Sequence, residues 1–295
     1  MNQEANPVME LVNFYLVPGL ILGSIYALGA IGITLIFGIM RFAHFAHGDM
    51  ATLGAYLALG LTTTLSLSPW AALPVAMAGT ALLAILLDRL FYHHLQNRPK
   101  ILTVMASLGV ALMLRSVVQV LWGVDPQVYT TGIVRAESFA GVMVRPREIA
   151  TFATAVGLMV VLVLFLRHTR WGKAMRAMSD NPDLARLCGI DNEAVVRLTW
   201  LIAGALAAAA GFFLGINTEL NTMMGWSALL AMFAAAILGG VGRVEGAVVG
   251  GLLIGVIEEL SVLVLPSQYK MATAFVILIA ILLFRPQGIF QGKVL

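Results

Sequence analysis

Long segments without a charged residue constrain the fold of this chain more than any other feature. No Asp, Glu, Lys or Arg occurs from Leu11 to Met40, and none occurs from Met50 to Leu87. A helix needs about 20 residues to cross roughly 30 Å of hydrocarbon, and a charged residue at the bilayer centre costs about 2.5–3.5 kcal/mol. The sequence therefore predicts an all-α polytopic membrane protein.

The same criterion predicts eight or nine transmembrane helices. Pro69 and Pro74 divide the second charge-free segment into two. Six further apolar segments cover 101–123, 149–166, 198–218, 220–242, 246–265 and 271–284. The last three leave the count open. The break at Gly239–Gly242 could instead form a re-entrant pair, and the short segment 271–284 crosses only if its flanking side chains snorkel.

The composition excludes a soluble enzyme domain. Apolar residues make up 60% of the 295 residues and charged residues 11%, against about 25% charged residues in soluble domains. No mostly polar segment is long enough for a nucleotide-binding domain, so any energy source must come from another subunit.

The single cysteine, Cys188, cannot form an internal disulfide. The first residues lack the basic segment of a cleaved signal peptide, so we expect the mature chain to keep its start.

Basic residues gather in alternate loops, and this pattern predicts the orientation in the membrane. Because Lys and Arg resist translocation, the loops that hold them stay in the cytoplasm. These loops contain Arg41, Arg89, Arg98, Lys100, six basic residues from Arg167 to Arg197, Arg243, Arg285 and Lys293. The other loops contain Glu4, Glu10, the mixed segment 124–148, Glu219 and Lys270. We therefore expect a periplasmic N-terminus and a cytoplasmic C-terminus.

Glycines recur at the G-x-x-x-G spacing, which lets two membrane helices approach closely. The pairs are Gly19/Gly23, Gly211/Gly215, Gly246/Gly250 and Gly251/Gly255, and they predict helix packing. The segments that begin at Gly19 and Gly251 also look alike over seven residues. Transporters are often built from repeats, but a likeness this short in an apolar background is more often chance.

The basic loop 167–197 contains the signals of a complete short helix. Asn181 is a good N-cap, Pro182 suits the first helical position, and Gly189 can take a left-handed conformation at the C-terminal end. Leu184, Leu187 and Cys188 fall at i, i+3 and i+4, which places them on one apolar face. This face could dock on another subunit, fold back on the ends of the protein's own helices, or rest on lipid headgroups.

Five ordered blocks of the sequence resemble the permeases of ATP-binding-cassette (ABC) importers, and in particular the branched-chain amino acid permeases of the LivH type. The blocks are GLILGSIYALGAIGITLIFG (19–38), FAHFAHGDMATLG (42–54), TRWGKAMRAMSDNPDLARLCGI (169–190), AILGGVGRVEGAVVGG (236–251) and RPQGIF (285–290). The likeness covers nearly the full length. It implies a single permease domain over 1–295, with 167–197 as its cytoplasmic coupling loop.

The resemblance also implies a function and partners. The subunit would form half of a pathway for Leu, Ile and Val across the bacterial inner membrane, without enzymatic activity or a cofactor of its own. It would pair with a second homologous permease, sit on two cytoplasmic ATP-binding subunits and receive substrate from a periplasmic solute-binding protein, with lipid around it and no nucleic acid. The residues implied in coupling are Asn181, Pro182, Leu184, Ala185, Leu187, Cys188 and Gly189.

Two predicted spans are joined by a segment that holds His44, His47 and Asp49, with Gly48 among them. An irregular backbone at this point could be a midmembrane break that lines the substrate pathway, whereas Arg41 favours an ordinary cytoplasmic turn. The related family usually has Asn at the position of His44, so this chain departs from the pattern there. The residue types suit a metal, but no Cys or further His joins them, and we predict no metal site.

Three ionisable residues fall inside predicted spans, and such residues are functional candidates by default. Glu258 is a candidate pathway residue, although a span that ends near Leu260 would let both Glu258 and Glu259 reach headgroup water, which the sequence favours. Arg115 could form a buried pair with a carboxylate or snorkel from a shifted span. The sequence does not name its partner.

Other functions are weaker alternatives. The glycine-rich segment 238–246 lacks the Gly-Lys-Ser/Thr ending of a phosphate-binding loop. An intramembrane enzyme would have to use His44, His47, Asp49 or the glutamates, but no H-E-x-x-H or G-x-S-x-G motif supports it. A passive channel stays possible, and the same importer architecture could carry urea, short amides or another small solute.

Overall fold

The structure is a computed structural model of the whole chain, and it describes residues 7–96, 98–129, 137–139, 142–285, 287–290 and 292. Glu4 and Lys293, which contribute to the predicted orientation, lie outside the described residues. So do Pro286 of the fifth sequence block and parts of the segment 124–148.

The described chain is almost entirely helical. Its helices are α1 (Pro7–Leu11), α2 (Val17–Met40), α3 (Ala46–Thr64), α4 (Pro69–Leu87), α5 (Lys100–Trp122), α6 (Pro146–His168), α7 (Arg170–Asp180), α8 (Pro182–Leu187), α9 (Asn192–Asn217), α10 (Met224–Gly239), α11 (Val244–Ser261) and α12 (Lys270–Phe284). Short π-helical turns at Val12–Leu16 and Asp88–Tyr92 extend α2 and α4. Strands β1 (Glu137–Phe139) and β2 (Val142–Val144) form a small antiparallel hairpin in which Glu137 pairs with Val144.

Local sequence explains several helix boundaries. Ser68 caps α4 by accepting a hydrogen bond from the amide of Ala71, and Pro69 occupies the first turn, where a missing N–H costs nothing. The predicted division of the second apolar segment at Pro69 is therefore confirmed. Pro74, in contrast, lies inside α4 and marks no boundary.

Among the residues that the structure describes, six helical segments are long and apolar enough to cross a membrane. They are Met9–Met40, Pro69–Leu95, Lys100–Trp122, Pro146–His168, Asn192–Asn217 and Ser267–Phe284, and α10 is a shorter apolar helix. Several helices of this length and hydropathy are typical of a polytopic membrane protein.

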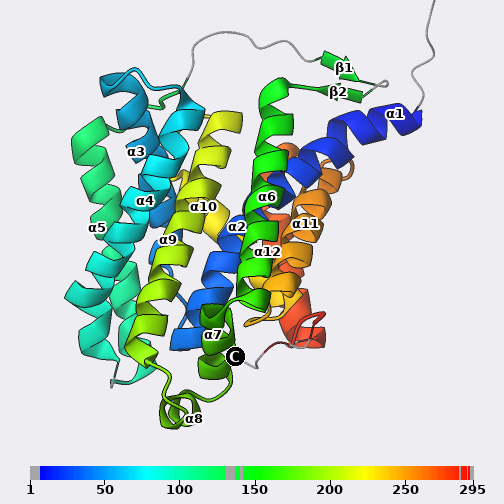
Figure 1. Cartoon of the computed structure of the whole chain (residues 1–295). Coiled ribbons are helices and arrows are strands. Elements are labelled where there is room, and N and C mark those ends of the chain that lie inside the picture. Colours follow the sequence, from blue (N-terminus) through cyan, green and yellow to red (C-terminus); the bar gives the residue numbers. More distant parts are fainter. Residues whose placement is uncertain are drawn as a thin grey trace, which may run out of the picture.

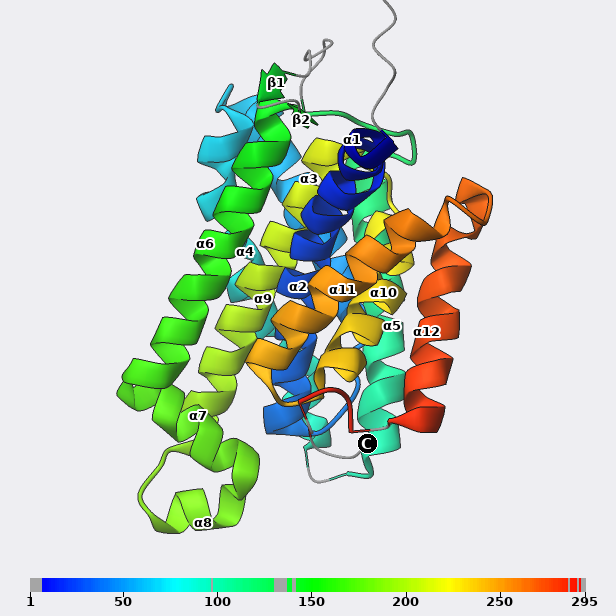
Figure 2. The same cartoon turned by 90° about the vertical axis from the view of Figure 1, so that its right-hand side faces the viewer.

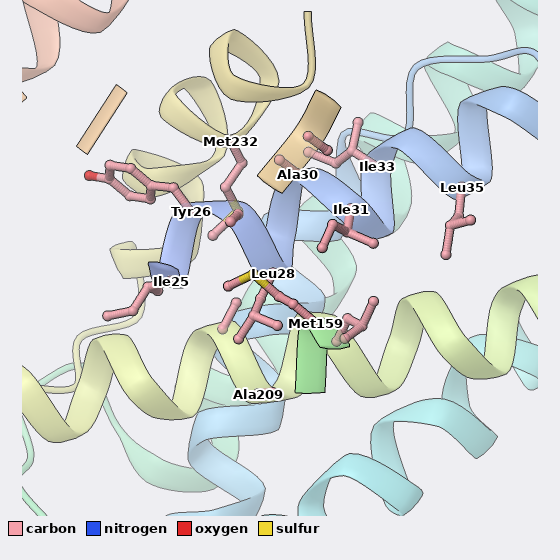
Figure 3. Packing of buried hydrophobic residues seen from close by; sticks show 14 of the residues in the cluster. Ile25, Tyr26, Leu28, Ala30, Ile31, Ile33, Leu35, Met159, Ala209 and Met232 are labelled. Carbon is pink, nitrogen blue, oxygen red and sulfur yellow. The ribbon is translucent and has the colours of Figure 1, made fainter. Parts of the chain in front are cut away.

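Helix α2 lies at the centre of the bundle, packed against α9, α10 and α11 (Figure 1). Most of its 24 residues are buried. Met159 of α6, Ala209 of α9 and Met232 of α10 all approach it (Figure 3). Helix α12 lies at the edge of the bundle (Figure 2), and Ala274 is its only buried residue.

The two ends of the bundle differ. Helices α7 and α8 lie at one end, whereas α1 and the β-hairpin lie at the opposite end (Figure 1). We call these the α8 end and the hairpin end.

Candidate functional site

The chain between α2 and α3 is irregular, and it is partly enclosed by the protein. Arg41 has a left-handed backbone (φ 57°) and is exposed at the end of α2. Phe42 and His44 are buried, and the amide of Phe45 donates to Ser107 Oγ of α5 at 3.2 Å. A side-chain acceptor thus replaces the helical carbonyl that this amide lacks. Arg41 reaches the surface while the next residues lie inside the protein. The midmembrane break and the cytoplasmic turn both stay predictions.

His44 and His47 are enclosed by packed side chains. His44 Nε2 lies 3.0 Å from the hydroxyl of Tyr92, and its ring centroid is 5.0 Å from that of Trp200. His47 interacts with the backbone of Gly29, although neither ring nitrogen reaches full hydrogen-bond geometry with a described residue. A Cβ at Gly32 would meet the ring of His47, so this glycine leaves the space that the ring fills. In this arrangement neither imidazole faces an open cavity.

Asp49 is the partner of Arg115. The Nε and Nη2 atoms of Arg115 donate to the two carboxylate oxygens of Asp49 at 2.9 and 3.1 Å, and the side chain of Asp49 is fully buried. The guanidinium also lies 5.0 Å from the ring centroid of Trp226. The pair therefore links α3, α5 and α10 in a bidentate, charge-assisted geometry. Of the two alternatives for Arg115, the buried pair is confirmed and snorkelling is wrong.

Gly48 lies where α3 crosses α10. A Cβ on Gly48 would meet the carbonyl of Gly225, and a Cβ on Gly225 would meet the backbone of Gly48. The amide of Gly225 donates to Thr52 Oγ1 at 3.0 Å. Gly225 is the partner that sequence reasoning missed, because it has no second glycine at the G-x-x-x-G spacing.

Glu258 and Glu259 have different surroundings. Glu258 is 4% exposed, and its Oε2 atom has no hydrogen-bond partner among the described residues. Its carboxyl group interacts with the hydroxyl of Tyr26 of α2. Glu259 instead forms an ion pair with Lys270, with N–O distances of 2.7 and 2.8 Å. The expectation that both carboxylates reach headgroup water is therefore wrong for Glu258, because α2 covers it.

The two alike glycine segments pack against each other. A Cβ on Gly19 would meet Val256, one on Gly23 would meet Leu252, and one on Gly255 would meet the backbone of Gly23. From Gly19 to Gly23 the chain moves forward along α2, while the residue contacted on α11 moves backward from Val256 to Leu252. The two helices therefore run antiparallel. Figure 2 shows α11 crossing in front of α2. Close backbone approach replaces side-chain interdigitation at this crossing.

The remaining predicted glycines also lie at close contacts. A Cβ on Gly211 of α9 would meet the backbone of Ala51, and one on Gly250 of α11 would meet that of Ala235. Gly251 lies against the backbone of Ala27, and Gly215 lies against the side chain of Leu220. These contacts join α3 to α9, α10 to α11, and α2 to α11.

The predicted short helix is present as α8. Asn181 Oδ1 accepts hydrogen bonds from the amides of Asp183 and Leu184 at 3.1 and 3.0 Å, and Pro182 is its first residue. Gly189 follows it with φ 82°. The local signals of the sequence therefore fix both ends of this helix.

The apolar face of α8 has no partner within the described chain. Leu184 is 57% exposed and Leu187 is 84% exposed, and Cys188 is exposed as a free thiol. Ala185, on the opposite side, is 3% exposed and packs against the protein. The alternative in which the leucine face folds back on the protein's own helices is wrong.

Sequence reasoning missed the aromatic surroundings of the irregular segment. Tyr92 and Trp200 are fully buried, and their rings stack at a centroid distance of 5.0 Å. They come from the turn after α4 and from α9, far apart in the sequence. No periodic pattern in either segment points to the other, so a three-dimensional contact alone reveals the cluster.

Comparisons with known proteins agree with this architecture. A family described as branched-chain amino acid transport system / permease component matches residues 15–282. The solved structure of PsaBC from Streptococcus pneumoniae, in complex with a Fab, is similar with a TM-score of 0.51 over 95% of each chain, at 14% sequence identity. The latter likeness concerns the fold alone.

Curated relatives match over nearly their whole length. The high-affinity branched-chain amino acid transport system permease protein BraD of Pseudomonas aeruginosa is 33% identical over 288 residues, which cover 93% of this chain and 94% of BraD. The corresponding permease protein LivH of Escherichia coli K12 is 31% identical over 92% of each chain. The ribose import permease protein RbsC of Escherichia coli K12 is 29% identical over 60% of this chain and 58% of RbsC. The chain belongs to the permease family of branched-chain amino acid transport systems.

Proposed function

We propose that this chain is a permease subunit of an ABC importer and forms half of the pathway for Leu, Ile and Val across the bacterial inner membrane. The observation that carries the proposal is the match to BraD and LivH over more than nine-tenths of each chain. Sequence identity over nearly the full length supports a shared transport role more strongly than a shared fold alone does, because one fold can host many functions.

The proposed topology has nine crossings, made by α2 to α6 and α9 to α12. Successive helices of this set run alternately between the α8 end and the hairpin end, and an odd number places the chain termini on opposite sides. Basic residues such as Arg41, Arg89 and Arg243 lie at the α8 end. By the positive-inside rule this end is cytoplasmic, and the hairpin end faces the periplasm.

Helix α8 is the proposed contact with a cytoplasmic ATP-binding subunit. Leu184 and Leu187 expose an apolar face on an element that projects from the bundle at the basic end (Figure 1). An exposed apolar patch on a charged surface is typical of a protein–protein contact. We propose that residues 167–197 form the coupling loop of a single permease domain, and that two partner subunits hydrolyse the ATP.

The buried polar residues serve the pathway indirectly in this proposal. Asp49 and Arg115 hold α3 and α5 together, and the fully buried His44 and His47 fix the irregular segment that starts α3. Glu258 adds a buried carboxyl group between α11 and α2. These side chains keep the pathway helices in place for a second, homologous permease subunit that completes the channel and for a periplasmic binding protein that delivers the cargo.

The cargo is tested by uptake in cells from which every other branched-chain amino acid importer has been removed. Deleting this subunit should abolish uptake of labelled Leu, Ile and Val, and restoring the gene should recover it. Unchanged uptake after deletion would contradict the proposed cargo.

A parallel measurement with labelled ribose, urea and a short amide covers the alternative cargoes. RbsC, a partial relative, is named for ribose import, so the fold itself does not exclude a different solute. Loss of uptake of one of these solutes, with Leu uptake unchanged, would assign the same importer architecture to that solute.

A further inference from the structure

A cavity lies at the α8 end, between α2, α6, α7 and the start of α11. Its volume is about 360 Å³, within the range of about 300–1,000 Å³ that small-molecule sites occupy. Figure 2 shows α7 at the end of the bundle where α2 ends and α11 begins. The described His44, His47, Asp49 and Glu258 do not line it, so this cavity is separate from the buried polar residues described above.

The walls of the cavity combine apolar and charged side chains. Leu35, Val163 and Met175 contribute aliphatic and thioether surface, while Arg176 and Arg243 contribute guanidinium groups. This division suits a ligand with a compact aliphatic part and a carboxylate, because Arg binds carboxylates through paired hydrogen bonds.

Negative charge lies beside the positive charge in the same cavity. Glu245 pairs with Arg167 at 3.1 Å, and both residues are about half exposed. The carboxylate of Glu245 therefore keeps oxygen lone pairs that can accept from an ammonium group. Arg176, Arg243 and Glu245 all line this cavity, so it offers an opposite charge to each of the two charges of a zwitterion.

A buried polar atom supplies a further point of contact. Thr34 of α2 lines the cavity and is 1% exposed, and its hydroxyl has no hydrogen-bond partner among the described residues. Burying a hydroxyl without a hydrogen-bond partner is unfavourable. A polar group of a bound ligand would give this hydroxyl a partner.

The cavity also touches the element that leads to α8. Ser179 of α7 lines it, and its hydroxyl donates to the carbonyl of Gly38 at the end of α2 at 3.0 Å. A ligand in the cavity would contact α7 together with α2 and α11, so it would favour the arrangement in which these elements are together. A ligand shifts an equilibrium only through such a difference in affinity between two states.

We propose that this cavity is a cytoplasmic-side binding site for a free aliphatic α-amino acid, and that its occupancy opposes movement of α7 and slows further import. The proposal rests on the proposed function, because the ligand is the released cargo. It makes the permease itself a sensor of the internal amino acid concentration. The carboxylate binds Arg176 and Arg243, the ammonium group binds Glu245, and the side chain lies against Leu35 and Val163.

The test uses the complete importer in lipid vesicles, with ATP inside and with the binding protein and labelled leucine outside. The measurement is the ratio of initial uptake rates in vesicles preloaded with unlabelled leucine and in empty vesicles. We expect preloading to lower this ratio several-fold for the wild type. For Arg243→Gln and Arg176→Gln the half-inhibiting leucine concentration should rise by about tenfold, since each loses a hydrogen bond to a charged group.

Arg89→Gln is the matched control, because Arg89 lies at the same end of the bundle and outside this cavity. It should keep the wild-type response to preloading. Equal inhibition of the wild type and both cavity variants, or no inhibition of the wild type, would overturn the proposal. Absence of uptake by the wild type in empty vesicles would instead count against the proposed function.

A lipid headgroup offers a phosphate where the amino acid offers a carboxylate, and the lipid composition separates these two sources of anion. The uptake ratio is measured in vesicles of phosphatidylcholine alone and in vesicles with added phosphatidylglycerol. Inhibition by leucine in both compositions supports the amino acid. An uptake rate that changes with the phosphatidylglycerol content and not with the internal leucine concentration would overturn the proposal and assign the cavity to lipid.

Discussion

Helices α2 and α8 are both rich in aliphatic residues, yet their surroundings are opposite. Most of the 24 residues of α2 are buried, whereas Ala185 alone of the six residues of α8 is buried. Hydrophobicity therefore does not distinguish a core helix from a contact surface in this protein. What separates them is whether a described helix covers the apolar face: α9, α10 and α11 cover α2, whereas Leu184 and Leu187 of α8 are left exposed.

The glycines explain why α2 finds partners. Gly19, Gly23 and the facing Gly255 let the backbones of α2 and α11 touch, and lipid-like side chains gain little from burial in a bilayer unless packing is this close. No described helix presents such a surface to Leu187 of α8, so this side chain stays exposed. The comparison predicts that substitutions in the bundle act on folding, while substitutions in α8 act on partner binding.

Removing one member of the buried ion pair should have the largest effect on stability. Arg115→Met leaves the carboxylate of Asp49 buried without its partner, and breaking a buried pair costs about 3–5 kcal/mol. We expect a large drop in the midpoint of thermal unfolding in detergent. The double variant Asp49→Leu/Arg115→Met should be clearly more stable than the single variant, and equal stability of the two would show that the pair itself is not responsible.

A substitution that widens the α2–α11 crossing should have the second-largest effect on stability. Gly255→Val places side-chain atoms where the backbone of Gly23 lies, and overpacking costs about 1–3 kcal/mol. The measurement is again the unfolding midpoint. Gly109→Val is the matched control, because a Cβ at Gly109 meets nothing within 4 Å. Equal destabilisation by both substitutions would contradict a special role of the crossing.

Loss of the cap of α8 should be smaller and local. Asn181→Ala removes the acceptor for the amides of Asp183 and Leu184, at a cost of about 0.5–2 kcal/mol to the helix. Hydrogen exchange of α8 should speed up while exchange in α2 stays unchanged. Asn181→Ser keeps a capping oxygen and should keep the slower exchange; acceleration in both variants would argue that the cap is not what orders α8.

Changing the exposed face of α8 should have the smallest effect on stability. Leu187 is 84% exposed, so Leu187→Asp should change the free energy of unfolding by less than about 0.5 kcal/mol. It should nevertheless abolish co-purification of the ATP-binding subunits and transport, because a charge would be buried in the proposed contact. Leu187→Met is the control and should retain both. Normal co-purification of the ATP-binding subunits with the Leu187→Asp variant would contradict a role of α8 in coupling.

Much of the fold was predictable because the membrane imposes simple rules. Charge-free segments located the long helices, and the local signals at Asn181, Pro182 and Gly189 gave both ends of α8. The sequence also placed Gly19 and Gly255 at helix crossings without naming their partners. The environment of Glu258 was predicted wrongly, because the distance to the end of its own helix suggested headgroup water while α2, more than two hundred residues away in the chain, covers it.

The sequence by itself determined that this chain is a helical membrane protein of the branched-chain amino acid permease family, since hydropathy and ordered motifs are local properties. Only the tertiary structure decided that Arg115 pairs with Asp49, that two glycine faces meet, and that the leucines of α8 stay exposed. The physical reason is that helix formation depends on neighbouring residues, whereas burial and pairing depend on which distant surfaces can approach closely enough to touch.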